Sequence, residues 1–360
     1  MTTVRTPTVF RAARQRAGRA GGERLLHCRM PSDSSRTGAG VLMAIGGAED
    51  KLGNKTILNR FVQLAGGPSA RIAVISTASS LGHEITELYR RLFLELGAAE
   101  VHGLRPSTRA EAEAPEAVAA VRGATGVFMT GGNQLRLSMV VEATSLGRAL
   151  VEAHGRGAVV GGTSAGASAL STHMVSFGRP GETPRQRMGQ LGVGLGLLPG
   201  VIVDQHFGQR NRIGRLLTLV AQSPGQLGLG LDEDTAAVIS ADGVLEVLGK
   251  GAVTIVDGSD VVSDAFEVRQ SRPILVSGAV VHSLPPGYRF DLAKRALLPR
   301  LQSLPPVEEA RPARGRRASP RRDPAARRLA QAVDAEGAAD RIPHRADPHP
   351  GAHTSEEASQ

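Results

Sequence analysis

The sequence predicts an α/β fold in which a mostly parallel sheet lies between layers of helices. Continuous apolar runs recur at residues 41–47, 71–77 and 126–132, and such runs are typical of strands that are buried on both faces. Segments of roughly ten to fifteen residues with apolar side chains at helical spacing separate them, which indicates βαβ units. Two of the runs end in paired glycines, as parallel strands do where they open into a site.

Each further element follows from its own pattern. The segment 83–96 has apolar side chains at helical spacing and is followed by Gly97, so we expect a helix that ends at this glycine. The other elements expected in the first half are a strand at 101–104, helices at 110–121 and 146–154, and a strand beginning with the apolar run 158–160. Those expected to complete the same domain are a strand leading into His206, a helix from about 209 to 221, and strands at 236–240, 244–248 and 253–256.

The predicted organisation is a single domain at residues 41–300 between two disordered tails. Residues 1–40 contain eight arginines and two acids, which account for about two-thirds of the formal net charge of +9. Residues 301–360 contain ten arginines and nine acids among many prolines and alanines, a composition that buries too little apolar surface to fold alone. The predicted domain is nearly neutral and lacks aromatic residues interleaved with basic ones, so no nucleic-acid partner is expected.

Cysteine content and hydropathy limit the cellular compartments in which the protein is expected. Cys28 is the only cysteine in the sequence, so neither a disulfide framework nor a cysteine-based metal site is expected. Arginine and glycine interrupt every apolar run of the first 30 residues, which argues against a secretory signal. No segment approaches the roughly 18 uncharged apolar residues of a membrane span, so we expect no membrane insertion and a cytoplasmic protein.

Residues 161–166, Gly-Gly-Thr-Ser-Ala-Gly, directly follow the apolar run 158–160. A buried strand that ends in small residues, turns sharply at a serine and continues as a helix is typical of a nucleophile elbow. Gly162 and Gly166 flank Ser164 because such a turn tolerates little bulk beside it. The turn holds the hydroxyl off the sheet and brings the next backbone N–H near it. We therefore expect Ser164 to be the nucleophile of a hydrolase.

A serine nucleophile requires a base and hydrogen-bond donors for the oxyanion. His206 is the candidate base, because it lies where a predicted strand ends and a helix begins, at the edge that holds Ser164 if the sheet is parallel. The candidate oxyanion donors are the backbone N–H groups of Gly132 and Ala165. The alternatives are a plain strand-to-helix joint or phosphate cradle at the serine and a structural role for the histidine. The sequence lacks the Lys-Ser/Thr pair of a phosphate-binding loop here, which disfavours the cradle.

Arg210, Arg212 and Arg215 form a second informative group. On a helix, Arg212 and Arg215 share a face, and Arg210 lies at its N-terminal edge near the candidate base. Guanidinium groups bind carboxylates through paired hydrogen bonds. The group therefore predicts a substrate that is acidic near the cleaved bond, and the alternative is an exposed charged face without a ligand.

Several motifs, in this order along the chain, resemble those of the cyanophycinase family. They are Thr-Ala-Ser-Ser at 77–80, Thr-Gly-Gly-Asn-Gln at 130–134, the elbow at 161–167, Asp-Gln-His-Phe at 204–207 with the arginines that follow, and Leu-Asp-Glu-Asp-Thr-Ala at 231–236. The resemblance covers about residues 40–292 and neither tail. It implies a serine exopeptidase with a class I glutamine-amidotransferase-like α/β fold, related to the aspartyl dipeptidase E group. It also implies a homodimer that uses neither a metal nor an organic cofactor.

The resemblance further implies a substrate and residue roles. The substrate is cyanophycin, a polyaspartate chain with an arginine joined to each side-chain carboxyl, or a similar β-aspartyl-arginine polymer, and the product is the β-Asp-Arg dipeptide. Ser164 is then the nucleophile and His206 the base. The residues implied to shape the substrate pocket are Gln134, Asp204, Gln205, Arg210, Arg212 and Arg215.

The acid that orients the histidine is implied by the same resemblance to lie between the nucleophile and the base. Glu182 is the only carboxylate between Ser164 and residue 203, so we expect it to complete the triad. Three consecutive acids remain as alternatives, either for this role or as contacts for the arginine of the substrate: Asp232, Glu233 and Asp234.

Two other functions remain open. A dipeptidase that cuts after an N-terminal α-linked aspartate shares the elbow, but the extended arginine group favours the polymer. A catalytically inactive module that binds anionic polymers would need neither Ser164 nor His206, and the presence of both favours an enzyme. An amidotransferase would have cysteine in place of Ser164.

Overall fold

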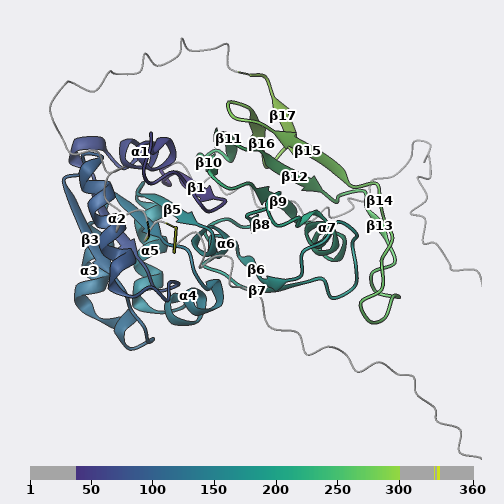
Figure 1. The fold of residues 1–360 in the computed structure, drawn as a ribbon, viewed down its shortest axis with the longest axis horizontal. Helices are drawn as coiled ribbons and strands as arrows, with labels where there is room; N and C mark the ends of the chain where they lie inside the picture. Colours follow the sequence, from purple (N-terminus) through teal and green to yellow (C-terminus); the bar gives the residue numbers. More distant parts are fainter. Residues whose placement is uncertain (1–37, 301–327, 329–330, 333–360) are drawn as a thin grey trace, which may run out of the picture.

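The computed structural model describes residues 38–300 and three isolated positions, 328, 331 and 332. The disorder predicted for residues 1–40 and 301–360 therefore falls almost wholly outside the described residues. The predicted α/β class is confirmed, because strands and helices alternate through the first half of the described chain. Figure 1 shows helices α1–α5 gathered at one end of the molecule, with a second sheet and α7 at the other end.

A nine-stranded sheet forms the frame of the fold, in the order β17-β16-β11-β10-β1-β5-β4-β2-β3. Its parallel part consists of β1 (Leu42–Ile45), β5 (Val159–Thr163), β4 (Gly126–Met129), β2 (Arg71–Ile75) and β3 (Glu100–Leu104). Its antiparallel part consists of β10 (Thr235–Ile239), β11 (Val244–Gly249), β16 (Arg289–Asp291) and β17 (Ala296–Leu298). The sheet is therefore mixed, with the predicted parallel arrangement in one part of it.

The strand that leads into His206 belongs to a second sheet, in the order β15-β12-β9-β8. Its members are β8 (Val201–Gln205), β9 (Leu227–Leu231), β12 (Val253–Asp257) and β15 (Val280–Leu284). Two hairpins complete the strands: β6 (His173–Gly178) with β7 (Gly189–Val193), and β13 (Val262–Ser263) with β14 (Val276–Ser277). The strand that precedes His206 thus does not belong to the sheet of Ser164, because an apolar run indicates burial and not the strand with which it pairs.

Alternate side chains of the parallel strands pack against helices on opposite faces of the sheet, as the twofold periodicity of a strand requires. Ile72 and Val74 pack with α1 (Thr56–Leu64) and α2 (His83–Glu95). Ala73 and Ile75 pack in the core that includes α3 (Pro115–Gly123), α4 (Gln134–Val141), α5 (Ser145–Gly155) and α6 (Ala165–Ala169). Because α6 also packs against β8, it lies between the two sheets.

The helices confirm some predicted boundaries and shift others. The helices expected at 83–96 and 146–154 are present as α2 and α5. The segment 110–121 divides into a 3₁₀ turn at Glu111–Glu113 and α3, since Pro115 fits the first position of a helix. The helix expected from about 209 begins later, as α7 (Ile213–Gln222). Within the described residues, no helix combines the length and apolar content that crossing a bilayer requires.

Candidate active site

The turn between β5 and α6 has the backbone geometry of a nucleophile elbow. Ser164 has φ 51° and ψ −109°, a conformation that is rare for a residue with a side chain. A Cβ atom at Gly162 would overlap the carbonyl group of Gly166, and one at Gly166 would lie 2.5 Å from the carbonyl oxygen of Met129. The close packing of strand and helix around the serine therefore requires both glycines.

The structure brings together the serine and the histidine that the sequence indicated from separate motifs. Ser164 Oγ and His206 Nε2 lie 2.9 Å apart, and both residues are buried, with 6% and 1% of their surface exposed. His206 has φ 48°, and its backbone N–H donates to the carbonyl of Gly46 at 2.8 Å. This bond ties the end of β8 to the end of β1, so the two sheets meet at the Ser164–His206 pair.

Glu233, in the loop between β9 and β10, continues this row of hydrogen bonds. Its Oε1 atom lies 2.7 Å from His206 Nδ1. Glu182, which we expected in this position, is exposed in the loop between β6 and β7, where its Oε1 accepts from Asn211 Nδ2 at 3.3 Å. The expectation for Glu182 is therefore corrected, because the loop that folds back over His206 comes later in the chain and not between the two residues.

The acids on either side of Glu233 hold its loop in place. Asp232 accepts from the backbone N–H groups of Gly208 and Ala252, each at 3.0 Å. Asp234 accepts from the N–H of Asp50 at 2.9 Å and pairs with Lys250 Nζ at 2.6 Å. Of the three consecutive acids, the middle one thus contacts the histidine. Across residues 38–300, no group of three or more His, Cys, Asp or Glu side chains is arranged to hold a metal ion.

The surroundings of His206 favour its neutral form. Burial, together with the nearby positive charges of Arg210, Arg212 and Lys51, lowers the pKa of the imidazole well below its ordinary value of 6.5. A neutral ring that donates from Nδ1 to Glu233 presents the lone pair of Nε2 to the hydroxyl of Ser164. The arrangement can therefore accept the proton of the serine at neutral pH.

Two of the three arginines are buried and held by residues of β8. Arg215 donates from Nε to Asp204 Oδ2 at 2.6 Å and contacts Oδ1 of the same carboxylate through Nη2. Arg212 lies 3.4 Å from Asp204 Oδ1 and 3.0 Å from Gln205 Oε1. Arg210 is partly exposed, and its backbone N–H donates to the carbonyl of His206. Arg212 and Arg215 are therefore buried and paired with residues of β8, so they do not form the exposed charged face that was the alternative to a substrate-binding group.

The candidate oxyanion donors lie on the two turns that border the nucleophile. An ideal Cβ at Gly131 would lie 3.9 Å from Ser164 Oγ, which places the Gly131-Gly132 turn against the serine. Ala165 is the first residue of α6, so helix geometry gives its N–H no acceptor within the helix. Both turns can therefore direct N–H groups towards a substrate at Ser164.

Gln134 borders the same region and has an unsatisfied acceptor. Its side chain is 3% exposed, and Nε2 donates to the carbonyls of Val175 and Ser176 at 3.2 and 2.7 Å. Among the described residues, its Oε1 is one of two buried side-chain atoms without a hydrogen-bond partner. A buried acceptor of this kind is costly unless a ligand or water satisfies it.

A buried charged group that the sequence did not lead us to expect lies behind the elbow. Glu49 is 2% exposed and accepts from Thr163 Oγ1 at 2.6 Å and from the hydroxyl of Tyr89. Lys51 Nζ lies 3.4 Å from the same carboxylate. Because Thr163 directly precedes the nucleophile, this group fixes the end of β5. Its signal in the sequence is the run of three charged residues at 49–51, which follows the glycine-terminated strand after one alanine.

Comparison with known proteins identifies the class of the chain. A family model described as "Peptidase family S51" matches residues 41–247. The match spans β1 to β11 and includes Ser164, His206 and Glu233. The fold and this match define a serine-type exopeptidase. The chain belongs to peptidase family S51.

Curated relatives and a solved structure agree with this assignment. The chain is 43% identical over 255 residues to a protein named cyanophycinase from Synechococcus elongatus, covering 70% of this chain and 79% of the relative. It is 42% identical over 262 residues to the cyanophycinase of Nostoc sp. strain PCC 7120, covering 72% and 88% of the two chains. The crystal structure of a peptidase from an acI-B1 actinobacterium matches with a TM-score of 0.50 and 24% identity, over 68% of this chain and 97% of that chain. This last likeness shows the fold alone, whereas the relatives confirm the family that the sequence motifs resembled.

Proposed function

We propose that this peptidase hydrolyses cyanophycin, or a similar β-aspartyl-arginine polymer, and releases β-Asp-Arg dipeptides. The observation that carries the proposal is the row of hydrogen bonds from Ser164 Oγ through His206 to Glu233 Oε1, with spacings of 2.9 and 2.7 Å. This row occurs in a chain that is 42–43% identical to proteins named cyanophycinase. Ser164, His206 and Glu233 are the proposed catalytic triad.

The proposed reaction is acyl transfer. Ser164 Oγ attacks the α-peptide carbonyl of the terminal unit while His206 Nε2 accepts the hydroxyl proton. The N–H groups of Ala165 and Gly132 stabilise the oxyanion. His206 then gives its proton to the leaving amine, and water, activated by the same imidazole, hydrolyses the acyl-enzyme. Glu233 holds the Nδ1–H tautomer throughout and stabilises the imidazolium when it forms.

The proposed substrate contacts follow from the exposure and the hydrogen-bonding groups of each pocket residue. Arg210, which is partly exposed beside the imidazole, binds a carboxylate of the terminal β-Asp-Arg unit. Gln134 Oε1 accepts a hydrogen bond from a substrate N–H or guanidinium group, which satisfies this buried atom. Arg212, Arg215 and their partners on β8, Asp204 and Gln205, give the pocket its shape and its positive potential.

The proposal includes the organisation of the molecule. Residues 41–300 act as one hydrolytic domain, and the protein is a cytoplasmic homodimer that needs no metal or organic cofactor for the chemistry. Light scattering after size exclusion tests the dimer. Activity after treatment with a chelator tests independence from metal, and a loss that added divalent metal restores would contradict it.

The decisive experiment compares the wild type with Ser164→Ala on purified cyanophycin. The wild type should release products with the mass of β-Asp-Arg, and the variant should lower the rate by roughly three to six powers of ten. Circular dichroism should show the same fold for both proteins. A variant that keeps its activity would exclude the serine mechanism. A wild type that cleaves α-linked Asp-X dipeptides but not the polymer would replace the proposed substrate.

A further inference from the structure

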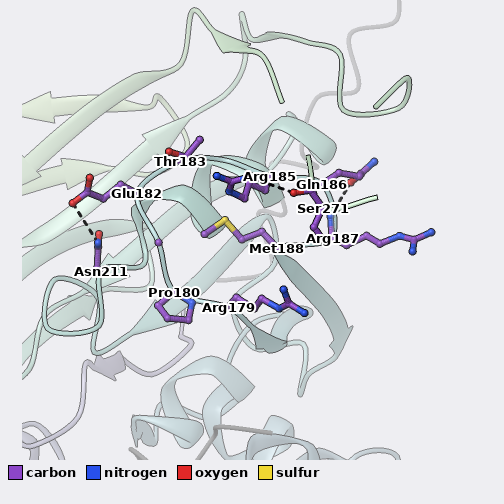
Figure 2. A pocket seen from close by; sticks show the side chains of 11 residues that line it. Arg179, Pro180, Glu182, Thr183, Arg185, Gln186, Arg187, Met188, Asn211 and Ser271 are labelled. Atoms are coloured by element: carbon purple, nitrogen blue, oxygen red, sulfur yellow. Dashed lines mark hydrogen bonds between the residues drawn. The ribbon is translucent and has the colours of Figure 1, made fainter. Parts of the chain in front are cut away.

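A pocket of about 510 Å³ lies in the loop between β6 and β7 (Figure 2). Residues 179–188 form most of its wall, together with Asn211 and Ser271. Its charged lining side chains are three arginines and one carboxylate: Arg179, Arg185, Arg187 and Glu182. The pocket therefore has an excess of positive charge, and the reaction proposed above uses none of these residues. We call it the arginine pocket.

Strand β6 connects the arginine pocket to the candidate active site. The carbonyl of Ser176 accepts from Gln134 Nε2 at 2.7 Å, and that of Gly178 accepts from Arg215 Nη1 at 2.9 Å. The next residue, Arg179, lines the pocket. Since a strand advances about 3.3 Å per residue, the pocket begins about 10 Å from the point where Gln134 meets β6.

The turn that follows His206 makes a second connection. Asn211 lines the arginine pocket, and the N–H of the preceding residue donates to the carbonyl of His206 at 3.1 Å. The pocket loop is bonded to this turn, because the N–H of Gly181 donates to the carbonyl of Asn211 at 2.7 Å. It is also bonded to α7, because the N–H of Gly214 donates to the carbonyl of Gly181 at 3.0 Å. Backbone hydrogen bonds therefore join the pocket loop to the turn that begins at the proposed base.

The positive charges of Arg185 and Arg187, which are both exposed, are available to a ligand from solvent. Within residues 38–300, neither Arg185 nor Arg187 forms an ion pair, and Arg185 reaches only the carbonyl of Ser271, at 3.5 Å. The single carboxylate, Glu182, accepts a hydrogen bond from Asn211. In Figure 2 the side chains of Arg179 and Arg187 extend in the same direction, on the opposite side of the pocket from Glu182. The region around Arg187 is therefore positively charged.

We propose that the arginine pocket binds carboxylates of the polymer beyond the unit that is being cleaved. The inference rests on the proposed function. Each arginine joined through nitrogen to the polyaspartate backbone keeps its own carboxylate, so the polymer presents one such group per unit. An extended chain advances about 3.5 Å per residue, so a carboxylate about three units from the terminal one can reach the pocket. Guanidinium groups recognise carboxylates by charge-assisted hydrogen bonds, and a second attachment point raises the affinity for long chains only.

The test measures kcat/KM of Arg187→Glu on a short chain of two or three units and on long polymer. The reversal should lower kcat/KM about fivefold on the long polymer, as expected for an exposed ion pair, and leave the short chain within twofold of the wild type. The double variant R185E/R187E should widen the difference. Because the Debye length falls to about 3 Å at 1 M salt, the difference between substrates should shrink at that ionic strength. Arg187→Lys, which keeps the charge, should retain most of the preference for long polymer.

The matched control is Arg60→Glu, which makes the same charge change at an exposed position of α1. It should leave the ratio of the two substrates unchanged, because α1 packs on the opposite face of the nine-stranded sheet from α6. Equal losses on short and long substrates for Arg187→Glu, or an unchanged ratio for the double variant, would overturn the inference while leaving the proposed function intact. A wild type that cleaves neither substrate would instead overturn the proposed function, and this inference with it.

Discussion

Two residues of the proposed site have backbone conformations that residues with side chains rarely adopt. Ser164 and His206 both have φ near 50°, at 51° and 48°, and each such residue costs on the order of 1–3 kcal/mol. Both are buried, and each backbone N–H bonds to the end of β1, to Ile45 or Gly46. These two backbone bonds and the surrounding packing hold Ser164 and His206 in their strained conformations. The serine hydroxyl is therefore directed at the imidazole before substrate binds.

The contact between Glu233 and His206 predicts a large effect of a small substitution. Glu233→Gln keeps the shape of the side chain but removes the negative charge that fixes the Nδ1–H tautomer and stabilises the imidazolium. We expect kcat to fall by about two to four powers of ten. Glu182→Gln should have a far smaller effect on kcat, because Glu182 contacts Asn211 and not the imidazole. Steady-state kinetics on a short substrate compare the two, and a larger loss for the Glu182 variant would restore it as the triad acid.

The lowered pKa of His206 predicts a pH-dependent stability. In the unfolded chain the imidazole binds a proton below its ordinary pKa of 6.5, whereas in the folded protein it stays neutral to much lower pH. Stability therefore falls as pH decreases below 6.5, by up to about 1.4 kcal/mol per pH unit. Urea unfolding near pH 7.5 and near pH 5.5 should show a smaller loss for His206→Gln than for the wild type. Parallel losses in the two proteins would mean that the folded pKa is not lowered.

The residues that the sequence identified are those whose role is visible in a local pattern. Ser164 lies in a glycine-flanked turn, and His206 ends an apolar run, so short segments were enough. Glu233 was only one of three neighbouring acids, and the contacts that separate it from Asp232 and Asp234 come from Gly208, Ala252, Asp50 and Lys250. These partners are distant in sequence, and one sequence contains no signal of such contacts.

At the scale of elements, an ion pair joins the start of α7 to the end of β8. Asp204 is fully buried, and Arg215 binds both of its oxygens. Arg215 also donates to the carbonyl of Gly178, so the same side chain connects the end of β6. The pair thus fixes three elements around the proposed pocket, while the unit charges of Asp204 and Arg215 compensate each other.

Removal of one partner of this ion pair should destabilise the fold and not only weaken binding. Arg215→Met removes the guanidinium that binds both oxygens of Asp204 and leaves this buried carboxylate only the 3.4 Å contact with Arg212. We expect this loss to lower the free energy of unfolding by about 3–5 kcal/mol. The double variant D204L/R215M should recover only part of this loss, because both charges of the pair are gone but the buried Arg212 also loses its contact with Asp204. Arg60→Met, at an exposed position of α1, should change the free energy by no more than about 0.5 kcal/mol. Urea midpoints compare the three proteins, and a stable Arg215→Met would show that the arginine is not structural.

The periodicity of the sequence predicted which segments are buried. It was less successful in predicting which strands pair with one another. Strands β1, β2, β4 and β5 were expected from their apolar runs and form adjacent parallel pairs. The run that becomes β8 has the same character but pairs with β9 in the second sheet. The helix boundary also moved, because residues 206–212 form hydrogen-bonded turns between β8 and α7 and not a first helical turn.

For the molecule as a whole, the proposed chemistry depends on how the two sheets meet. Ser164 follows a strand of the nine-stranded sheet, and His206 follows a strand of the four-stranded sheet. The end of β1 joins them, because the carbonyl of Gly46 accepts from His206 and that of Gly47 accepts from Asp234. Asp234 and Glu233 both belong to the short loop between β9 and β10. This loop therefore connects the two sheets beside the proposed triad.

This junction leaves no room for a side chain at residue 47. Gly47 has φ +98°, and an ideal Cβ there would lie 2.5 Å from His206 Nε2, so Gly47→Ala must displace the imidazole. We expect kcat to fall by about two powers of ten or more, since a displacement of about 1 Å at a reacting group costs that much. Gly97→Ala is the matched control, because Gly97 has φ +96° with no atom within 4 Å of its ideal Cβ. Gly97→Ala imposes similar backbone strain at the end of α2. The free energy of unfolding should therefore fall by a similar amount in the two variants, while kcat of Gly97→Ala stays near that of the wild type. If both variants lose activity to the same extent, strain and not the position of His206 explains the loss, and the contact between the sheets is not what sets the rate.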